Sequence, residues 1–241
     1  MSETKNPDVV VLAAGFGRRM LPLTETTPKP LLEAGRRPLI DHVISNCMAE
    51  GCNRFAVNAH YHADQIAAHV AELQRRFPLA EFQLSEEPDQ PLDTGGGVKK
   101  ALALLDSDPV LIANADAFWP TGDDKPLARL QQQFSKESDI VLLCAHPARA
   151  LGFRRSHDFC LAPDKKITND RGMPVIYTGV ALIRRSLFAD TPDGPFSLVD
   201  LFYKAGDLGR LHGVLLNAPW LHAGDPEALD EIDTMLRDRH K

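Results

Sequence analysis

Residues 9–20 read VVVLAAGFGRRM, and this stretch predicts both a fold and a binding site. Its first four residues are apolar and three of them are β-branched, which is typical of a short strand buried on both faces. The strand runs into small residues that leave backbone N–H groups uncovered. These residues are Ala13, Ala14, Gly15 and Gly17. Arg18 and Arg19 follow, so the turn can bind an anion through amides and cations together.

Short apolar runs and amphipathic stretches alternate along the rest of the chain. In the first half, we expect strands at 9–12, 55–58, 81–84 and 109–114 and helices at 38–47, 63–77 and 98–105. In the second half, we expect strands at 140–145, 175–183 and 211–216, a hairpin at 159–167, and helices at 196–205 and 226–237. Asp225 and Pro226 form a start signal for the last helix. This order predicts an α/β fold: a Rossmann-like three-layer αβα sandwich with a mostly parallel mixed sheet.

The composition is that of an ordinary globular protein of 241 residues, with a net charge of −6 and a pI near 5.8. The acidic balance argues against general nucleic-acid binding. Residues 1–8 are polar, unlike a signal peptide, and no apolar run reaches membrane-spanning length. We therefore expect a cytoplasmic protein with no nucleic-acid or membrane partner, folded as a single domain over 1–241. The four cysteines lack the spacing of a zinc site and are expected to be reduced thiols.

The glycine loop does not fit the two common phosphate-binding motifs. A P-loop requires Gly-Lys-Ser/Thr after its spacer, and neither Gly15 nor Gly17 is followed by one. A dinucleotide fingerprint would require a third glycine where Met20 stands. What remains is a wider cationic loop that includes Lys29 between two prolines, and this pattern favours a polyphosphate ligand.

These residues resemble the sugar-phosphate nucleotidyltransferases, which join a nucleoside triphosphate to a sugar 1-phosphate and release pyrophosphate. The resemblance rests on Gly15, Gly17, Arg19 and Met20 followed by Pro28-Lys29-Pro30. Further matches follow in the family's order: VNAHY at 57–61, LDTGGG at 92–97, Asn114-Ala115-Asp116, YTG at 177–179 and WLHAG at 220–224. The resemblance covers nearly the whole chain and implies a single nucleotidyltransferase domain.

The resemblance also implies roles for individual residues. The catalytic residues are expected to be Arg19, Lys29 and Asp116. The nucleotide is expected to contact Leu12, Ala13, Ala14, Gly15, Gly17, Arg18, Asn58, His60, Thr94, Gly95, Gly96 and Asn114. The sugar is expected to contact Glu87, Tyr177, Thr178 and Gly179. Asn58 and His60 could bond a base edge or simply close their strand, and residues 92–97 are expected to form an open glycine loop before the helix at Val98.

A divalent ion is the expected cofactor. Asp116 follows a buried strand, where open α/β sheets place their ligands, and one or two carboxylates with phosphate oxygens suit Mg²⁺. Mn²⁺ or another divalent ion could replace it. The family's second aspartate is His222 here, and imidazole suits softer metals better. The second ligand could therefore be His222, Asp225 or only water.

The chemistry requires no general base, because a sugar 1-phosphate is already an anion at neutral pH. The compact chain and its LDTGGG loop resemble most the N-acetylmuramate 1-phosphate uridylyltransferases of cell-wall recycling, which use UTP. The alternative is a compact mannose-1-phosphate guanylyltransferase that uses GTP. A hypothesis of another class is a non-catalytic, nucleotide-sensing regulatory subunit, favoured by the missing aspartate at His222. We expect a monomer or a homodimer.

Overall fold

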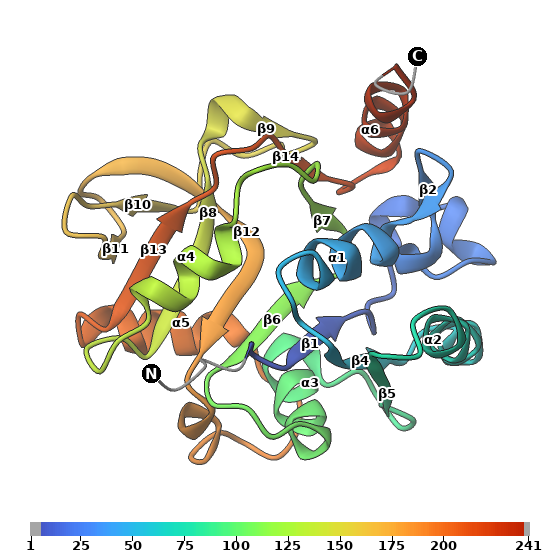
Figure 1. The fold of residues 1–241 in the computed structure, drawn as a ribbon, viewed down its shortest axis with the longest axis horizontal. Helices are drawn as coiled ribbons and strands as arrows, with labels where there is room; N and C mark the ends of the chain where they lie inside the picture. Colours follow the sequence, from blue (N-terminus) through green and yellow to red (C-terminus); the bar gives the residue numbers. More distant parts are fainter. Residues whose placement is uncertain (1–5, 239–241) are drawn as a thin grey trace.

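The computed structural model describes residues 6–238, in which a nine-stranded mixed sheet forms the centre (Figure 1). Its parallel part has the order β6, β1, β4 and β5, which are Val110–Asn114, Val9–Leu12, Arg54–Ala59 and Glu81–Glu86. The other strands are β8 (Ile140–Ala145), β10 (Phe159–Leu161), β11 (Ile167–Thr168), β12 (Met173–Ile183) and β13 (Leu211–Leu215). The long strand β12 runs antiparallel to both β6 and β8 and so joins the two parts.

Helices cover both faces of this sheet. Helices α1 (Leu39–Met48), α2 (Ala63–Arg76) and α4 (Pro126–Gln133) enclose one apolar core, and α3 (Asp93–Ala101) and α5 (Leu198–Asp207) enclose the other. Strand side chains alternate between the two cores: Val9 and Val11 enter the first and Val10 the second. This alternation is the period of two that a strand requires. The predicted layered α/β fold is confirmed.

The last helix, α6 (Pro226–Asp238), begins where the sequence predicts. The Asp225 carboxylate accepts a hydrogen bond from the Ala228 N–H at 2.8 Å, as an N-cap does. The helix lies against the short hairpin of β2 (Glu33–Ala34) and β3 (Arg37–Pro38).

The glycine run at 95–97 is not an open loop, and this is the main correction to the predicted elements. Helix α3 starts at Asp93, so all three glycines lie inside it. A Cβ atom would sit 2.2 Å from the Phe196 ring at Gly95 and 2.3 Å from the Gly194 carbonyl oxygen at Gly96. The glycines therefore allow the segment before α5 to pack directly on the helix, and this contact outweighs their poor helix propensity.

A second, small sheet brings three distant segments together beside the carboxyl end of β6. It has the order β7, β14 and β9, which are Ala117–Phe118, Trp220–His222 and Ala150–Leu151. The Ala223 N–H donates to the Asp116 carbonyl oxygen at 3.0 Å. The pairing fixes His222 opposite Ala117 and therefore next to Asp116.

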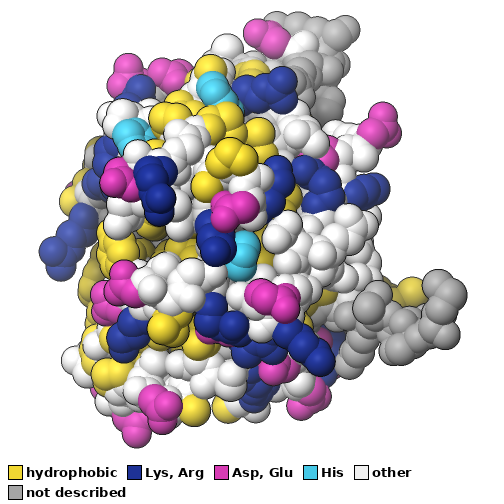
Figure 2. Space-filling view, turned by 90° about the vertical axis from the view of Figure 1, so that its left-hand side faces the viewer, with side chains coloured by type: hydrophobic (Ala, Val, Ile, Leu, Met, Phe, Trp, Pro, Cys, Tyr) yellow, Lys and Arg dark blue, Asp and Glu magenta, His cyan; other side chains and the backbone are white. Residues whose placement is uncertain are grey.

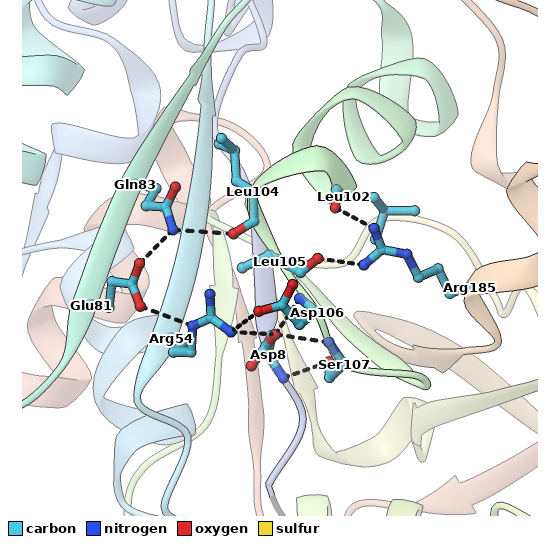
Figure 3. Close-up of polar contacts among 10 residues, drawn as sticks. All are labelled: Asp8, Arg54, Glu81, Gln83, Leu102, Leu104, Leu105, Asp106, Ser107 and Arg185. Atoms are coloured by element: carbon cyan, nitrogen blue, oxygen red, sulfur yellow. Dashed lines mark hydrogen bonds and ion pairs between the residues drawn. The ribbon is translucent and has the colours of Figure 1, made fainter.

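The opposite end of the parallel strands is held by a polar network around Arg54 and Asp8 (Figure 3). The Arg54 guanidinium contacts Asp106 at 2.8 Å, Glu81 at 2.9 Å and the buried Asp8 at 3.4 Å. Asp8 also accepts the backbone N–H groups of Asp106 and Ser107. The network ties β1, β4, β5 and the segment before β6 together, far from the end of the sheet that carries Asp116.

The surface on the side of β10, β11 and β13 carries basic and acidic side chains close together (Figure 2). None of the described helices combines the length and the apolar character that spanning a membrane requires. All four cysteines are buried and unbridged, as expected.

Candidate active site

The loop after β1 brings a lysine onto the carboxylate at the end of β6. Lys29 follows the extended Pro28 and is 9% exposed, and its Nζ atom lies 2.5 Å from Oδ2 of Asp116. Gly17 has a left-handed φ of 62°, and a Cβ atom there would lie 2.9 Å from Thr24 and 3.0 Å from Lys29. Only glycine allows this loop to fold so closely around the lysine.

The positive charges around Asp116 keep its carboxylate ionised. Burial raises the pKa of Asp116, but Lys29, His222 and Arg19 together hold it below its ordinary value, so the carboxylate is ionised at neutral pH. Burial lowers the pKa of His222, and the attraction of Asp116 does not restore it. The imidazole is therefore neutral at neutral pH and can act as a ligand.

A cavity of about 360 Å³ opens above the carboxyl ends of β1 and β6. Most of the residues expected to bind the nucleotide or act in catalysis line it: Leu12, Ala13, Ala14, Gly15, Gly17, Arg18, Arg19, Lys29, Asn58, Thr94, Asn114 and Asp116. Within the described residues, the N–H groups of Ala14 and Gly15 donate to no other protein group, whereas the Ala13 N–H is bound by Asn58 Oδ1 at 2.6 Å. Two amides are thus available for an anion, as the sequence suggests for this loop.

Three of the expected nucleotide contacts do not line this cavity. His60 Nδ1 lies 2.7 Å from the backbone oxygen of Glu87, and the ring packs edge-on against Phe16. The N–H groups of Gly95 and Gly96 donate to the Phe196 carbonyl oxygen at 2.9 and 3.4 Å. These amides are therefore used within the protein, and Asp93 and Thr94 are the residues of this segment that line the cavity.

Glu87, which we expected beside the other sugar-binding residues, lines this first cavity instead. It is 2% exposed, and its carboxylate accepts hydrogen bonds from the Asn58 side chain at 2.7 Å and from the Leu92 N–H at 2.8 Å. Glu87 thereby fixes Asn58 and the turn before α3. Its position at the end of β5 accounts for this, because β5 lies beside β4, which carries Asn58.

A second cavity of about 410 Å³ lies on the other side of Asn114 and Arg19, which line both cavities. The three other residues expected at the sugar, Tyr177, Thr178 and Gly179, line it together with His222. Gly179 has a left-handed φ of 86°, and a Cβ atom there would lie 2.9 Å from Asn114. Two ligands bound in the two cavities would therefore meet at Arg19.

Comparison with known proteins agrees with this geometry. Residues 8–152 match the nucleotidyl transferase family. An N-acetylmuramate alpha-1-phosphate uridylyltransferase from Caulobacter vibrioides is 38% identical over 223 residues, which are 91% of this chain and 92% of that protein. The chain belongs to the nucleotidyl transferase family.

More distant relatives share the fold of this nucleotidyl transferase. A mannose-1-phosphate guanyltransferase from Aspergillus fumigatus is 27% identical over 232 residues. The matched region is 90% of this chain and 61% of that protein. The solved structure of an inositol-1-phosphate CTP transferase from T. maritima superimposes with a TM-score of 0.73 at 17% identity, over 97% of each chain.

The donor set of this nucleotidyl transferase fits a divalent ion that arrives with phosphate. Nε2 of His222 lies 3.8 Å from Oδ2 of Asp116. Among the described residues, no three or more histidine, cysteine or carboxylate side chains gather closely enough to hold a metal. Mg²⁺ typically takes one or two protein ligands and completes its shell with water and phosphate oxygens. Asp225, the alternative ligand, is paired with Arg154 instead.

Three charged residues of the second cavity were not singled out from the sequence: Arg154, Arg155 and Asp158. They lie in the segment between β9 and β10. Asp158 is largely buried and accepts the Tyr177 N–H at 3.0 Å. Burial raises its pKa, and Arg155 opposes that shift. The adjacent arginines at 154 and 155 were the available signal in the sequence. Arginines are common in surface loops, however, so the pair alone does not indicate a binding site.

Proposed function

We propose that the protein transfers a uridylyl group from UTP to N-acetylmuramate 1-phosphate and releases pyrophosphate. The observation that carries this proposal is the clustering of Arg19, Lys29 and Asp116 on the wall of the first cavity, at the point where Arg19 also lines the second. The substrate pair follows the Caulobacter vibrioides relative. On this proposal, residues 1–241 act as one nucleotidyltransferase domain.

The transfer needs alignment and charge neutralisation rather than a general base. A phosphate monoester has a second pKa of about 6, so its attacking oxygen is already anionic at neutral pH. Arg19, on both cavity walls, is positioned to hold the sugar phosphate near the α-phosphorus. Lys29 and the N–H groups of Ala14 and Gly15 would then neutralise the triphosphate as charge develops on the leaving pyrophosphate.

We further propose that the enzyme depends on Mg²⁺ or Mn²⁺, held by Asp116 with His222 or water as the second ligand. The ion would supply positive charge to the phosphate oxygens of the bound nucleotide. The ionised Asp116 suits this role, and its contact with the Lys29 ammonium is consistent with a site for positive charge.

A guanylyltransferase acting on mannose 1-phosphate with GTP is the second candidate, supported by the Aspergillus fumigatus relative. A non-catalytic, nucleotide-sensing subunit fits less well, because Arg19, Lys29 and Asp116 are all present and close together. Since nucleoside triphosphates are cytoplasmic metabolites, we propose a cytoplasmic enzyme. The monomeric or dimeric state stays a prediction.

Pyrophosphate release from a panel of four nucleoside triphosphates and several sugar 1-phosphates tests these alternatives together. We expect the highest kcat/KM with UTP and N-acetylmuramate 1-phosphate in the presence of Mg²⁺. The highest kcat/KM with GTP and mannose 1-phosphate would support the second candidate. Nucleotide binding without turnover of any pair would support the regulatory subunit.

A further inference from the structure

The wall of the second cavity contains two adjacent arginines that the proposed transfer reaction does not use. Arg154 and Arg155 come from the segment between β9 and β10. Their surroundings differ. The Arg154 guanidinium faces three carboxylates at the start of α6: Asp225 at 3.2 Å, Glu227 at 3.1 Å and Glu231 at 3.9 Å. The charge of Arg154 is therefore balanced within the protein, and it fastens this segment to α6.

Arg155 faces a single carboxylate. One of its terminal nitrogens lies 2.7 Å from Oδ1 of Asp158, and the other oxygen of Asp158 accepts the Tyr177 N–H. The Arg155 side chain is 74% exposed, whereas that of Asp158 is 12% exposed. A guanidinium has five N–H donors in a rigid fork, so a group anchored at one nitrogen can still bind a second carboxylate.

A series of ring contacts connects Arg155 to Asp116. The Arg155 guanidinium lies 5.3 Å from the centre of the Phe153 ring, which lies 5.9 Å from that of Trp220. The Trp220 and His222 rings stack at 5.3 Å, and His222 approaches Asp116. Asp116 and Arg155 are therefore the two ends of this series of contacts, with the rings of Phe153, Trp220 and His222 between them.

We propose that Arg155 binds a carboxylate on the sugar of the acceptor, and that the protein selects acidic sugar 1-phosphates through this contact. The inference rests on the proposed function. In N-acetylmuramate 1-phosphate, the lactyl ether on C3 carries a carboxylate, and C3 is two ring atoms away from C1, which carries the phosphate. Arginine and carboxylate form short, charge-assisted hydrogen bonds. With its phosphate at Arg19, such a sugar would direct its carboxylate away from Asp116 and toward Arg155.

The test compares two acceptors that differ only in the lactyl group: N-acetylmuramate 1-phosphate and N-acetylglucosamine 1-phosphate. The readout is the ratio of their kcat/KM values in pyrophosphate release at saturating UTP and Mg²⁺. Arg155→Gln should lower this ratio by about 10-fold or more, the effect of losing one hydrogen bond to a charged group. Arg155→Lys should lower it less, since it keeps the charge but not the fork.

Arg171→Gln is the matched control, because Arg171 is 85% exposed, faces a neighbouring aspartate and lies outside the cavity. It should leave the ratio unchanged. Turnover of N-acetylglucosamine 1-phosphate by the Arg155 variant shows in the same sample that it is folded. If wild type prefers the acidic sugar and Arg155→Gln leaves the ratio unchanged, the inference is overturned and the proposed function is not. A wild type that does not use the acidic sugar would overturn the proposed substrate and the inference together.

Discussion

Replacing Gly96 with alanine should destabilise the protein, although alanine is the better helix former. Gly96 lies inside α3, where alanine would gain about 1 kcal/mol of helix propensity. Its Cβ atom would, however, sit 2.3 Å from the Gly194 carbonyl oxygen and 3.1 Å from Leu92 Cβ. The oxygen belongs to the backbone and cannot rotate away as a side chain could. The Gly194 backbone would have to move by about 1 Å to reach a normal C···O contact.

Such overpacking typically costs about 1–3 kcal/mol, and the gain in helix propensity offsets about 1 kcal/mol of it, so we expect a net loss of up to about 2 kcal/mol in the free energy of unfolding. Urea denaturation followed by circular dichroism measures it. Gly206→Ala is the matched control, because Gly206 lies in α5 and its added Cβ would meet only Leu211, at 3.8 Å. The free energy of unfolding of this variant should rise by up to about 1 kcal/mol. If Gly96→Ala is instead more stable than wild type, as helix propensity alone would make it, the close packing of residues 194–196 on α3 is wrong.

Three further predictions concern the metal ligand, the network at the far end of the sheet and the charge of Asp116. His222→Asp should keep or raise Mg²⁺-supported turnover, because a carboxylate suits Mg²⁺ better than imidazole; a folded but inactive variant would show that the histidine has another role. Arg54→Ala should lower the free energy of unfolding by about 1–3 kcal/mol, because it leaves the buried Asp8 without its cation, and should leave kcat unchanged; lost turnover in the folded variant would contradict a purely structural role. The pKa of Asp116 is lowered, so its contribution to stability is present above its unfolded-state pKa of about 3.9 and is lost as pH falls through the folded value. The stability difference between wild type and Asp116→Asn should accordingly stay constant from pH 8 to about 5, and a difference that already disappears near pH 6 would refute this.

The sequence predicts the central strands well because their residues are buried on both faces. The runs at Val9–Leu12 and Ile140–Ala145 are apolar throughout and bounded by breaks, and both strands begin and end at the predicted residues. The glycine run misled the prediction for a physical reason. Glycine is a poor helix former, and the approach of Phe196 that requires Gly95 comes from a segment about 100 residues away.

The site was predictable where one loop carries its residues and less so where distant segments meet. The cluster of Arg19, Lys29 and Asp116 follows from the glycine loop and the end of a buried strand. The small sheet of β7, β9 and β14 has strands of two or three residues, too short to show a periodic pattern. Its pairing brings the segment that carries Arg155 to the second cavity, which no local pattern in the sequence indicates.

Turnover of Asp116→Ala and Arg19→Ala with UTP, N-acetylmuramate 1-phosphate and Mg²⁺ tests the proposed transfer site most directly. Arg19 lines both cavities, and Asp116 lines the first and lies 3.8 Å from His222 of the second, so each loss should remove stabilisation that only the transition state receives. We predict rates of pyrophosphate release at least ~100-fold below wild type, with cooperative unfolding retained. A folded variant of either residue that releases pyrophosphate at the wild-type rate would contradict the account.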